Sequence, residues 1–188
     1  MKKIGITGSL ASGKSTASKI LAKYKGPLFS ADEIVNKLYK KVSFQKIICK
    51  NFKISKKHNI KKTLRKKILY DRTAIKKLEK IIHPLVRKEM NKFFIKNRTK
   101  RFIFFEIPLL IESKLMKFFD LIIFIKANKK IRLKRFKKKG GSSTLFNVLN
   151  NKQIKDNLKV KFCDHVIVNE NNLMILKKNL LDIFEKYE

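Results

Sequence analysis

Residues 8–15 read Gly8-Ser9-Leu10-Ala11-Ser12-Gly13-Lys14-Ser15, which fits the pattern G-x-x-x-x-G-K-S. Glycines at both fixed positions let the backbone turn tightly and approach an anion without a Cβ in the way. Successive N–H groups then point into one concavity, and the positive end of the following helix adds to the attraction. A β-prone run, Lys2–Thr7, precedes the pattern, and an amphipathic run, Thr16–Tyr24, follows it. The stretch therefore predicts a strand, a phosphate-binding loop and a helix, in that order.

Two side chains of this pattern carry chemistry. Lys14 is expected to reach the β- and γ-phosphates of a nucleoside triphosphate, and the Ser15 hydroxyl is placed to ligate Mg²⁺. The plain alternative is a strand, a turn and a helix that bind no ligand. The flanking strand and helix patterns favour the nucleotide site.

The length of 188 residues, with 44% apolar side chains, is typical of one globular unit with room for a small inserted module. The sequence has no run of eighteen apolar residues, so we expect no transmembrane helix. Two N-terminal lysines are not followed by a long apolar segment, so we expect no signal peptide. Cys49 and Cys163 stand far apart and lack the spacing of metal ligands, which indicates reduced thiols in a cytoplasmic protein.

The charge balance is extreme, with 48 Lys and Arg against 14 Asp and Glu and a formal net charge of +34. One interpretation is a polyanionic partner, such as nucleic acid or a membrane surface. The other is a biased composition, because Lys, Ile, Asn and Phe are all abundant while Trp is absent. Most lysines are spread along predicted helices, as solvated helix faces would have them. We therefore expect neither an obligate nucleic acid nor a membrane as partner.

Apolar runs alternate with helical patterns along the chain. Nearly continuous runs such as Phe102–Ile107 and Leu121–Ile125 are typical of parallel strands buried on both faces. Further strands are expected at 27–29 and 165–168, and helices at 33–41, from Ser43, at 61–70, 73–97, 129–138, 144–162 and 173–187. This alternation predicts an α/β fold with a parallel sheet, in which ligands bind beyond the carboxyl ends of the strands.

Local signals refine these elements. Ser43 and Thr73 are expected to cap helices, and Pro84 inside the long helix is expected to kink or break it. Residues 53–59 are polar and are expected to form a turn. Gly140-Gly141-Ser142-Ser143 reads as a flexible joint before a polar segment, typical of a lid that closes over a nucleotide. The last helix is expected to turn Leu173, Leu176, Leu180, Ile183 and Phe184 inward.

Acidic side chains follow two of the expected strands. Asp32 comes just after the second strand, where it could accept a proton from an acceptor hydroxyl, hold Mg²⁺ through water, or merely cap the next helix. Glu106 ends the third expected strand. It could help to hold Mg²⁺, bind a ribose, or simply terminate the strand. Both residues are candidates for the site.

The basic run 126–139 contains two arginines, Arg132 and Arg135, one helical turn apart. Such arginines can stabilise the equatorial oxygens of a transferring phosphoryl group, and the alternative is a solvated basic face. His83 precedes Pro84, and from the sequence alone it reads as a surface histidine at a tolerated kink.

Taken in order, these residues resemble the dephospho-CoA kinase family. The resemblance covers nearly the whole chain, and its His-Pro and Pro-Leu-Leu-x-Glu segments are more particular to that family than the phosphate loop. It rests on Ile4–Gly8 leading into the loop, Phe29–Asp32 with Val35 and Leu38-Tyr39, Leu64-Arg65, Ile82–Val86, Pro108-Leu109-Leu110 with Glu112, Gln153 with Lys159, and Cys163-Asp164 to Asn169.

The resemblance implies a P-loop kinase with a three-layer fold similar to nucleotide kinases. It implies a five-stranded parallel sheet in a core of residues 1–29, 98–137 and 163–188, a helical CoA-binding insert at about 30–97 and a lid at about 138–162. The implied reaction, the last step of CoA biosynthesis, moves the ATP γ-phosphate to the ribose 3′-hydroxyl of dephospho-CoA and needs Mg²⁺. We expect a monomer or a small homo-oligomer.

The resemblance also assigns the site residues. ATP would be bound by Ala11, Ser12, Gly13, Lys14, Ser15 and Thr16, with Ser15 on the metal. The catalytic residues would be Lys14, Asp32 and Arg135. The acceptor would be bound by Asp32, Arg65, His83 and Glu106.

Several positions depart from the family pattern. Ser30 stands where relatives usually carry a first Asp, and Glu106 stands where Asp is usual. Ser9 and Ala11 replace glycines that are often seen in the loop, and they narrow its allowed dihedrals. The lid offers lysines, Lys152, Lys155 and Lys159, where many relatives carry arginines, and lysine is a point charge rather than a fork. Two rival functions remain open. One is another small-molecule or nucleotide P-loop kinase, and the other, suggested by the net charge of +34, is a basic nucleic-acid-binding protein with a vestigial ATP site.

Overall fold

The computed structural model describes residues 1–55 and 59–187, apart from the side chains of 65, 66, 68–70 and 72. The middle of the turn expected at 53–59 thus lies outside the described residues. The chain divides into two compact units, Met1–Ser30 with Asn97–Glu188, and Ala31–Lys96. The first unit contains the sheet and the phosphate loop, and the second is helical.

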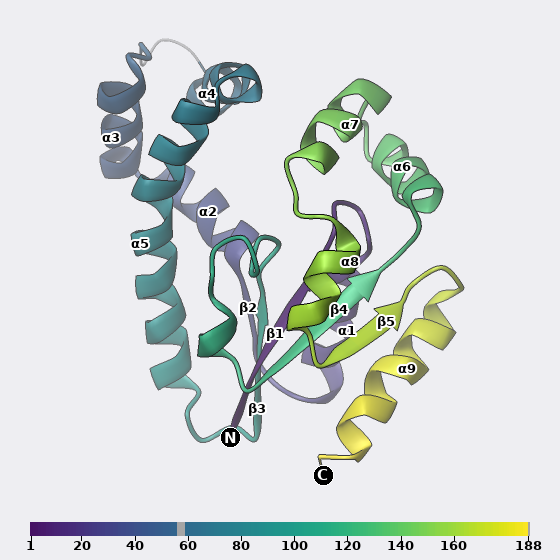
Figure 1. Cartoon of the computed structure of the whole chain (residues 1–188). Helices are drawn as coiled ribbons and strands as arrows, with labels where there is room; N and C mark the ends of the chain where they lie inside the picture. The colour runs from purple at the N-terminus through teal and green to yellow at the C-terminus, as the bar shows by residue number, and fades with distance from the viewer. Residues whose placement is uncertain (56–58, 188) are drawn as a thin grey trace. The chain divides into compact units, whose positions relative to one another are not determined.

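Within the described residues, five parallel strands form one sheet in the order β2-β3-β1-β4-β5 (Figure 1). The predicted α/β fold with a parallel sheet is confirmed. The strands are β1 (Lys2–Gly8), β2 (Leu28–Ser30), β3 (Phe102–Glu106), β4 (Leu121–Lys126) and β5 (His165–Val168). Ile6 of β1 pairs with Glu106 of β3, so the loop after β1 begins beside the carboxyl end of β3.

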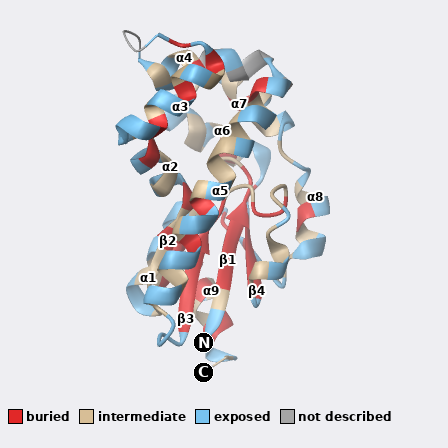
Figure 2. Cartoon of the chain, turned by 90° about the vertical axis from the view of Figure 1, so that its left-hand side faces the viewer, coloured by how far each residue is buried: buried red, intermediate tan, exposed pale blue. Residues whose placement is uncertain are grey.

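Helices α1 (Lys14–Tyr24) and α9 (Leu173–Glu185) pack on one face of this sheet. The central strands β1, β3 and β4 are largely buried, as the apolar runs of β3 and β4 predicted, and Figure 2 shows β3 and most of β1 as buried. Four of the five predicted inward residues of the last helix are buried. Leu173 is 61% exposed, so its inward assignment is wrong, because the helix begins there and turns this first residue outward. The core on this face contains Ile4, Ile6, Leu21, Phe104, Ile123, Ile125, Leu180 and Phe184.

The opposite face of the sheet is covered by the segment after β3. Phe105 of β3 packs edge-on against Phe118, with ring centroids 5.6 Å apart, and also contacts Phe119. Phe118 ends a short 3-10 turn, η1 (Met116–Phe118), that the sequence did not predict. This aromatic packing fixes the chain that runs from Glu106 to β4.

Helix α6 (Lys129–Lys138) has its predicted bounds, and Gly140 and Gly141 end it in a hydrogen-bonded turn. The Gly141 N–H donates to the Phe136 carbonyl and the Gly140 N–H to the Lys137 carbonyl, the two bonds of a Schellman motif. The single helix predicted at 144–162 is wrong. It is three pieces, α7 (Ser143–Asn151), α8 (Asp156–Lys159) and the 3-10 turn η2 (Val160–Phe162).

The helical unit contains α2 (Ala31–Lys40), α3 (Val42–Phe52), α4 (Ile60–Tyr70) and α5 (Arg72–Lys96). It has its own apolar core, which includes Leu38, Phe44, Ile48, Phe52, Ile54 and Leu64. No described helix of the chain is both long and apolar enough to cross a membrane.

Two expected caps in this unit are wrong, and of the kink or break expected at Pro84 the break does not occur. The cap of α5 is Asp71, whose Oδ1 accepts from the N–H groups of Thr73 and Ala74, because an ionised carboxylate is a better acceptor than the Thr73 hydroxyl. Helix α3 begins at Val42, so Ser43 lies inside its first turn. Helix α5 continues through Pro84, where the proline costs one backbone hydrogen bond.

Candidate active site

Both fixed glycines of the phosphate loop are required by its shape. Gly8 has φ 153°, and a Cβ there would lie 2.3 Å from the Ile125 carbonyl oxygen. Gly13 has φ 100°, in the left-handed region, and a Cβ there would lie 2.1 Å from Asn169 Nδ2. A side chain at either position would therefore push the loop away from β4 or from the end of β5. Ala11 also adopts a left-handed conformation, with φ 60°, which a residue with a Cβ rarely does.

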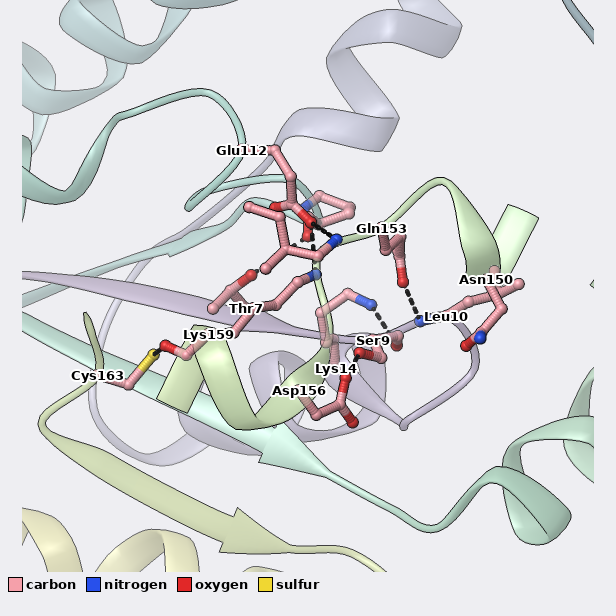
Figure 3. Close-up of polar contacts among 12 residues, drawn as sticks. Thr7, Ser9, Leu10, Lys14, Glu112, Asn150, Gln153, Asp156, Lys159 and Cys163 are labelled. Atoms are coloured by element: carbon pink, nitrogen blue, oxygen red, sulfur yellow. Dashed lines mark hydrogen bonds and ion pairs between the residues drawn. The ribbon is translucent and has the colours of Figure 1, made fainter. Parts of the chain in front are cut away.

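The loop folds back on the carbonyl of Ser9. This oxygen accepts from the Ser12 N–H at 3.1 Å and from Lys14 Nζ at 3.0 Å. Lys14 is half-buried at the start of α1, with its amine over the loop (Figure 3). The first N–H groups of a helix have no intrahelical partner, so the start of α1 presents donors and a positive dipole end to a phosphate.

Next to Lys14, the Ser15 hydroxyl donates to Glu106 Oε1 at 2.6 Å. Glu106 is 4% exposed and lies at the carboxyl end of β3, whereas Ser15 is exposed in the first turn of α1. A hydroxyl and a carboxylate are the hard oxygen ligands that Mg²⁺ prefers. These two residues are therefore able to hold the metal of a metal–nucleotide complex, and of the three interpretations of Glu106 this contact favours metal support.

The carbonyl of Ser12 is held from two other elements. Arg135 Nη1 on α6 donates to it at 3.2 Å, and Asn169 Nδ2, one residue after β5, donates at 2.8 Å. The structure thus brings Arg135 to the phosphate loop. Asn169 is 6% exposed, and no role was predicted for it beyond its place in the resemblance. The sequence feature that could have identified Asn169 is its position just after the carboxyl end of the strand expected at 165–168.

Arg132 occupies a more buried position than Arg135 and is 6% exposed. Its Nη1 donates to Asn150 Oδ1 at 2.8 Å and to the Leu10 carbonyl at 3.3 Å, while Nε donates to the Ala127 carbonyl. Burial lowers the pKa of this guanidinium, and the nearby Asp156 carboxylate opposes that shift. Arg132 therefore connects the loop, through the Leu10 carbonyl, to Asn150 of α7.

The connection between α7 and α8 lies against the same loop (Figure 3). Gln153 Oε1 accepts from the Leu10 N–H at 2.9 Å, and Asp156 Oδ1 accepts from the Ser9 hydroxyl. These tertiary contacts explain why the polar stretch 144–162 is not one helix, since residues 152–155 leave the helical path to reach the loop.

A buried ion pair anchors this connection. Lys159 Nζ, fully buried, lies 2.6 Å from Glu112 Oε1, which also accepts from the Ile154 N–H at 3.3 Å. Lys159 was expected to serve the lid as a positive charge. The structure instead pairs it with Glu112 in the interior, because a buried ammonium needs a carboxylate partner.

The remaining expected site residues lie in the helical unit. Helix α2 begins at Ala31, so Asp32 stands exposed in its first turn, beyond the position of a cap. His83 is half-buried in α5, one residue before Pro84. Arg65 lies in α4, but its side chain lies outside the described part of the structure.

Comparisons with known proteins bear on the whole chain. The family model for dephospho-CoA kinase matches residues 2–174. A dephospho-CoA kinase of Fusobacterium nucleatum is 34% identical over 193 residues, which cover 98% of this chain and 94% of that protein. The crystal structure of TT1252 from Thermus thermophilus has a TM-score of 0.86 at 23% identity, covering 100% of this chain and 98% of that one. A dephospho-CoA kinase structure from Campylobacter jejuni has a TM-score of 0.62 at 25% identity, covering 98% and 96%.

Proposed function

We propose, since the chain belongs to the dephospho-CoA kinase family, that it moves the γ-phosphoryl group of ATP to the ribose 3′-hydroxyl of dephospho-CoA, giving CoA and ADP. The observation that carries this proposal is the phosphate loop with Lys14, Ser15 and Glu106 around it, in a chain that the family model matches from residue 2 to residue 174. Phosphoryl transfer is mostly positioning and charge neutralisation, which is what such a loop offers.

The ATP side of the site is formed by the loop and the start of α1. The N–H groups of residues 11–16 would hold the phosphates. The Lys14 ammonium has three donors, so it would keep the Ser9 carbonyl and also meet the β- and γ-phosphates. Arg135, which already bonds the Ser12 carbonyl, would place its planar guanidinium beside the γ-phosphoryl group. These contacts supply the charge that the transition state needs on its equatorial oxygens.

The metal would be Mg²⁺, held by the Ser15 hydroxyl with Glu106 in support. When bound, Mg²⁺ would neutralise charge that develops on the phosphates in the reaction. Glu106 fits this role because its carboxylate is buried and already bonded to Ser15, so it orients that hydroxyl.

The helical unit Ala31–Lys96 would bind dephospho-CoA, and residues 138–162 would form the lid. Asp32 would orient the 3′-hydroxyl and accept its proton, since its carboxylate is exposed and can accept a hydrogen bond from that hydroxyl. Arg65 and His83 would line the acceptor side. We further propose that the enzyme works in the cytoplasm as a monomer or small homo-oligomer, without nucleic acid or membrane.

The deciding experiment measures ADP release by the purified full-length chain with MgATP, coupled to NADH oxidation. We expect release that depends on dephospho-CoA and a product that is 3′-phosphorylated by mass spectrometry and NMR. Shikimate and nucleoside monophosphates in the same assay test the rival small-molecule kinases. Nanomolar binding of duplex DNA at physiological salt, with no ADP release on adding dephospho-CoA, would contradict the proposal.

A further inference from the structure

Ser9 occupies a variable position of the loop pattern, yet it is 2% exposed and is bonded on two sides. Its carbonyl accepts from Lys14 Nζ and from the Ser12 N–H. Its hydroxyl donates to Asp156 Oδ1, in the first turn of α8 (Figure 3). A displacement of Ser9 would therefore move its two partners, the Lys14 amine and the Ser12 N–H.

The next residue, Leu10, is held from the same part of the structure. Its N–H donates to Gln153 Oε1 and its carbonyl accepts from Arg132 Nη1. Side chains from α6 and from the α7–α8 connection thus bond both peptide groups of Leu10. The first half of the loop owes its position to these side chains.

Ala11 explains why the loop depends on such support. A residue with a Cβ in the left-handed conformation costs about 1–2 kcal/mol, and it persists only where the surroundings fix it. Bonds to Leu10 lie on one side of Ala11, and bonds to the Ser12 carbonyl lie on the other. If the residues before Ala11 lost these bonds, Ala11 could leave its left-handed conformation and the loop would change shape.

The negative charge of Asp156, taken alone, predicts the opposite effect on ATP affinity. A carboxylate near a phosphate site repels the ligand, and the nearby Arg132 guanidinium acts against that repulsion. If Asp156 acted through its charge alone, its removal would tighten ATP binding. If it acts by holding Ser9, its removal would weaken ATP binding.

We propose that Ser9 and Asp156 are positioning residues, whose hydrogen bond holds the phosphate loop and Lys14 in the shape that receives the phosphates of ATP. The inference rests on the proposed function for the identity of the ligand. Neither side chain needs to touch ATP, since Asp156 acts on Ser9 and Ser9 acts on Lys14.

The test compares Ser9→Ala, Asp156→Ala, the double variant, Asp156→Asn and Asn157→Ala in the full-length chain. The Kd of MgATP is measured by calorimetry, and KM for ATP and for dephospho-CoA by ADP release. Each single alanine variant is expected to raise both the Kd and the KM of ATP about threefold to tenfold, the range expected for one lost hydrogen bond. The KM of dephospho-CoA is expected to change less than twofold.

Two comparisons separate positioning from general loosening. The double variant is expected to be no weaker than the single variants, because both remove the same bond. Asp156→Asn keeps an acceptor oxygen and is expected to bind ATP within about twofold of the wild type. Asn157→Ala, at an exposed neighbour on α8, is the matched control and is expected to match the wild type.

Three outcomes would overturn the inference: tighter ATP binding in Asp156→Ala, additive effects in the double variant, or an unchanged Kd in both single variants. A wild-type chain that binds MgATP but releases no ADP with dephospho-CoA would contradict the proposed function instead. The comparison of ATP affinities would still decide the inference in that case.

Discussion

Ser15 Oγ lies 2.6 Å from Glu106 Oε1, so the first turn of α1 is bonded to the carboxyl end of β3. The two residues are 91 positions apart in the sequence and meet because β3 lies beside β1 in the sheet. An exposed hydroxyl is thereby held by a buried carboxylate. In the proposed enzyme this relationship would affect how tightly the metal is held.

Replacing Glu106 by Gln should therefore raise the need for Mg²⁺. The amide keeps the side chain's shape but removes the negative charge behind Ser15, and loss of a partner of this kind costs about tenfold in metal affinity. We expect the Mg²⁺ concentration for half-maximal ADP release to rise about tenfold at constant ATP. Glu170→Gln, the same change at an exposed residue that bonds Asn128, is the control. An unchanged Mg²⁺ titration in Glu106→Gln would rule out the metal-supporting role.

Lys14→Ala and Asp32→Asn should affect turnover to different degrees. Loss of Lys14 removes the charge on the phosphates, and we expect kcat to fall about a thousandfold. Loss of a general base costs about a hundredfold or more, with ATP affinity retained, whereas loss of a residue that only orients the hydroxyl costs less. The measurement is kcat and the Kd of MgATP for each variant. Glu33→Gln, the neighbouring acid in the first turn of α2, is the control, and unchanged turnover in Asp32→Asn would show that Asp32 is not the base.

Arg132→Lys and Arg135→Lys should separate stability from catalysis. Arg132 is buried and bonds Ala127, Leu10 and Asn150, contacts that one ammonium cannot reproduce, so we expect a loss of about 2 kcal/mol in urea unfolding. Arg135 is half-buried, and we expect its lysine variant to unfold within about 1 kcal/mol of the wild type. Its kcat should fall about tenfold or more, because the planar fork is lost. The reverse pattern would place the catalytic arginine at 132.

Local patterns were sufficient for much of the fold. Helix α6 and strand β5 have the bounds expected from the sequence, because each is a short element whose residues and flanking signals agree. The carboxyl ends of parallel strands also identified Glu106 before any contact was known. The Ser15–Glu106 bond itself depends on strand order, which a pattern of residues does not contain.

Tertiary contacts account for what the sequence could not predict. The stretch 144–162 was expected to be one polar helix, yet residues 152–155 leave the helix because Gln153 and Ile154 bond the phosphate loop and Glu112. From the sequence, Lys159 was interpreted as a lysine of the lid. Its partner Glu112 lies 47 positions earlier, so no local pattern connects the two residues. Both errors arise because local propensity is weaker than a buried polar contact.

The buried pair of Lys159 and Glu112 leads to a prediction on stability. Lys159→Met leaves Glu112 without its cation, and breaking a buried pair from one side costs about 3–5 kcal/mol. We expect the urea midpoint to fall accordingly. Adding Glu112→Gln should recover part of the loss, since the amide still accepts from the Ile154 N–H and carries no charge. A Lys159→Met variant within about 1 kcal/mol of the wild type would show that the pair does not support the fold.

Cys163 should be protected from alkylation until high pH. Burial, and to a lesser degree the Asp164 carboxylate, raises the pKa of this thiol from 9.0 to about 11, and the thiol donates to the Lys159 carbonyl. Two pH units correspond to about a hundredfold less thiolate at pH 8, so iodoacetamide should react about a hundredfold more slowly with the native Cys49→Ser variant than with the same variant in urea. Because the folded state holds this proton more tightly, its contribution to stability is intact below pH 9 and is lost as pH rises toward 11. Equal alkylation rates in the native and unfolded forms at pH 8 would show that the thiol is not held in this way.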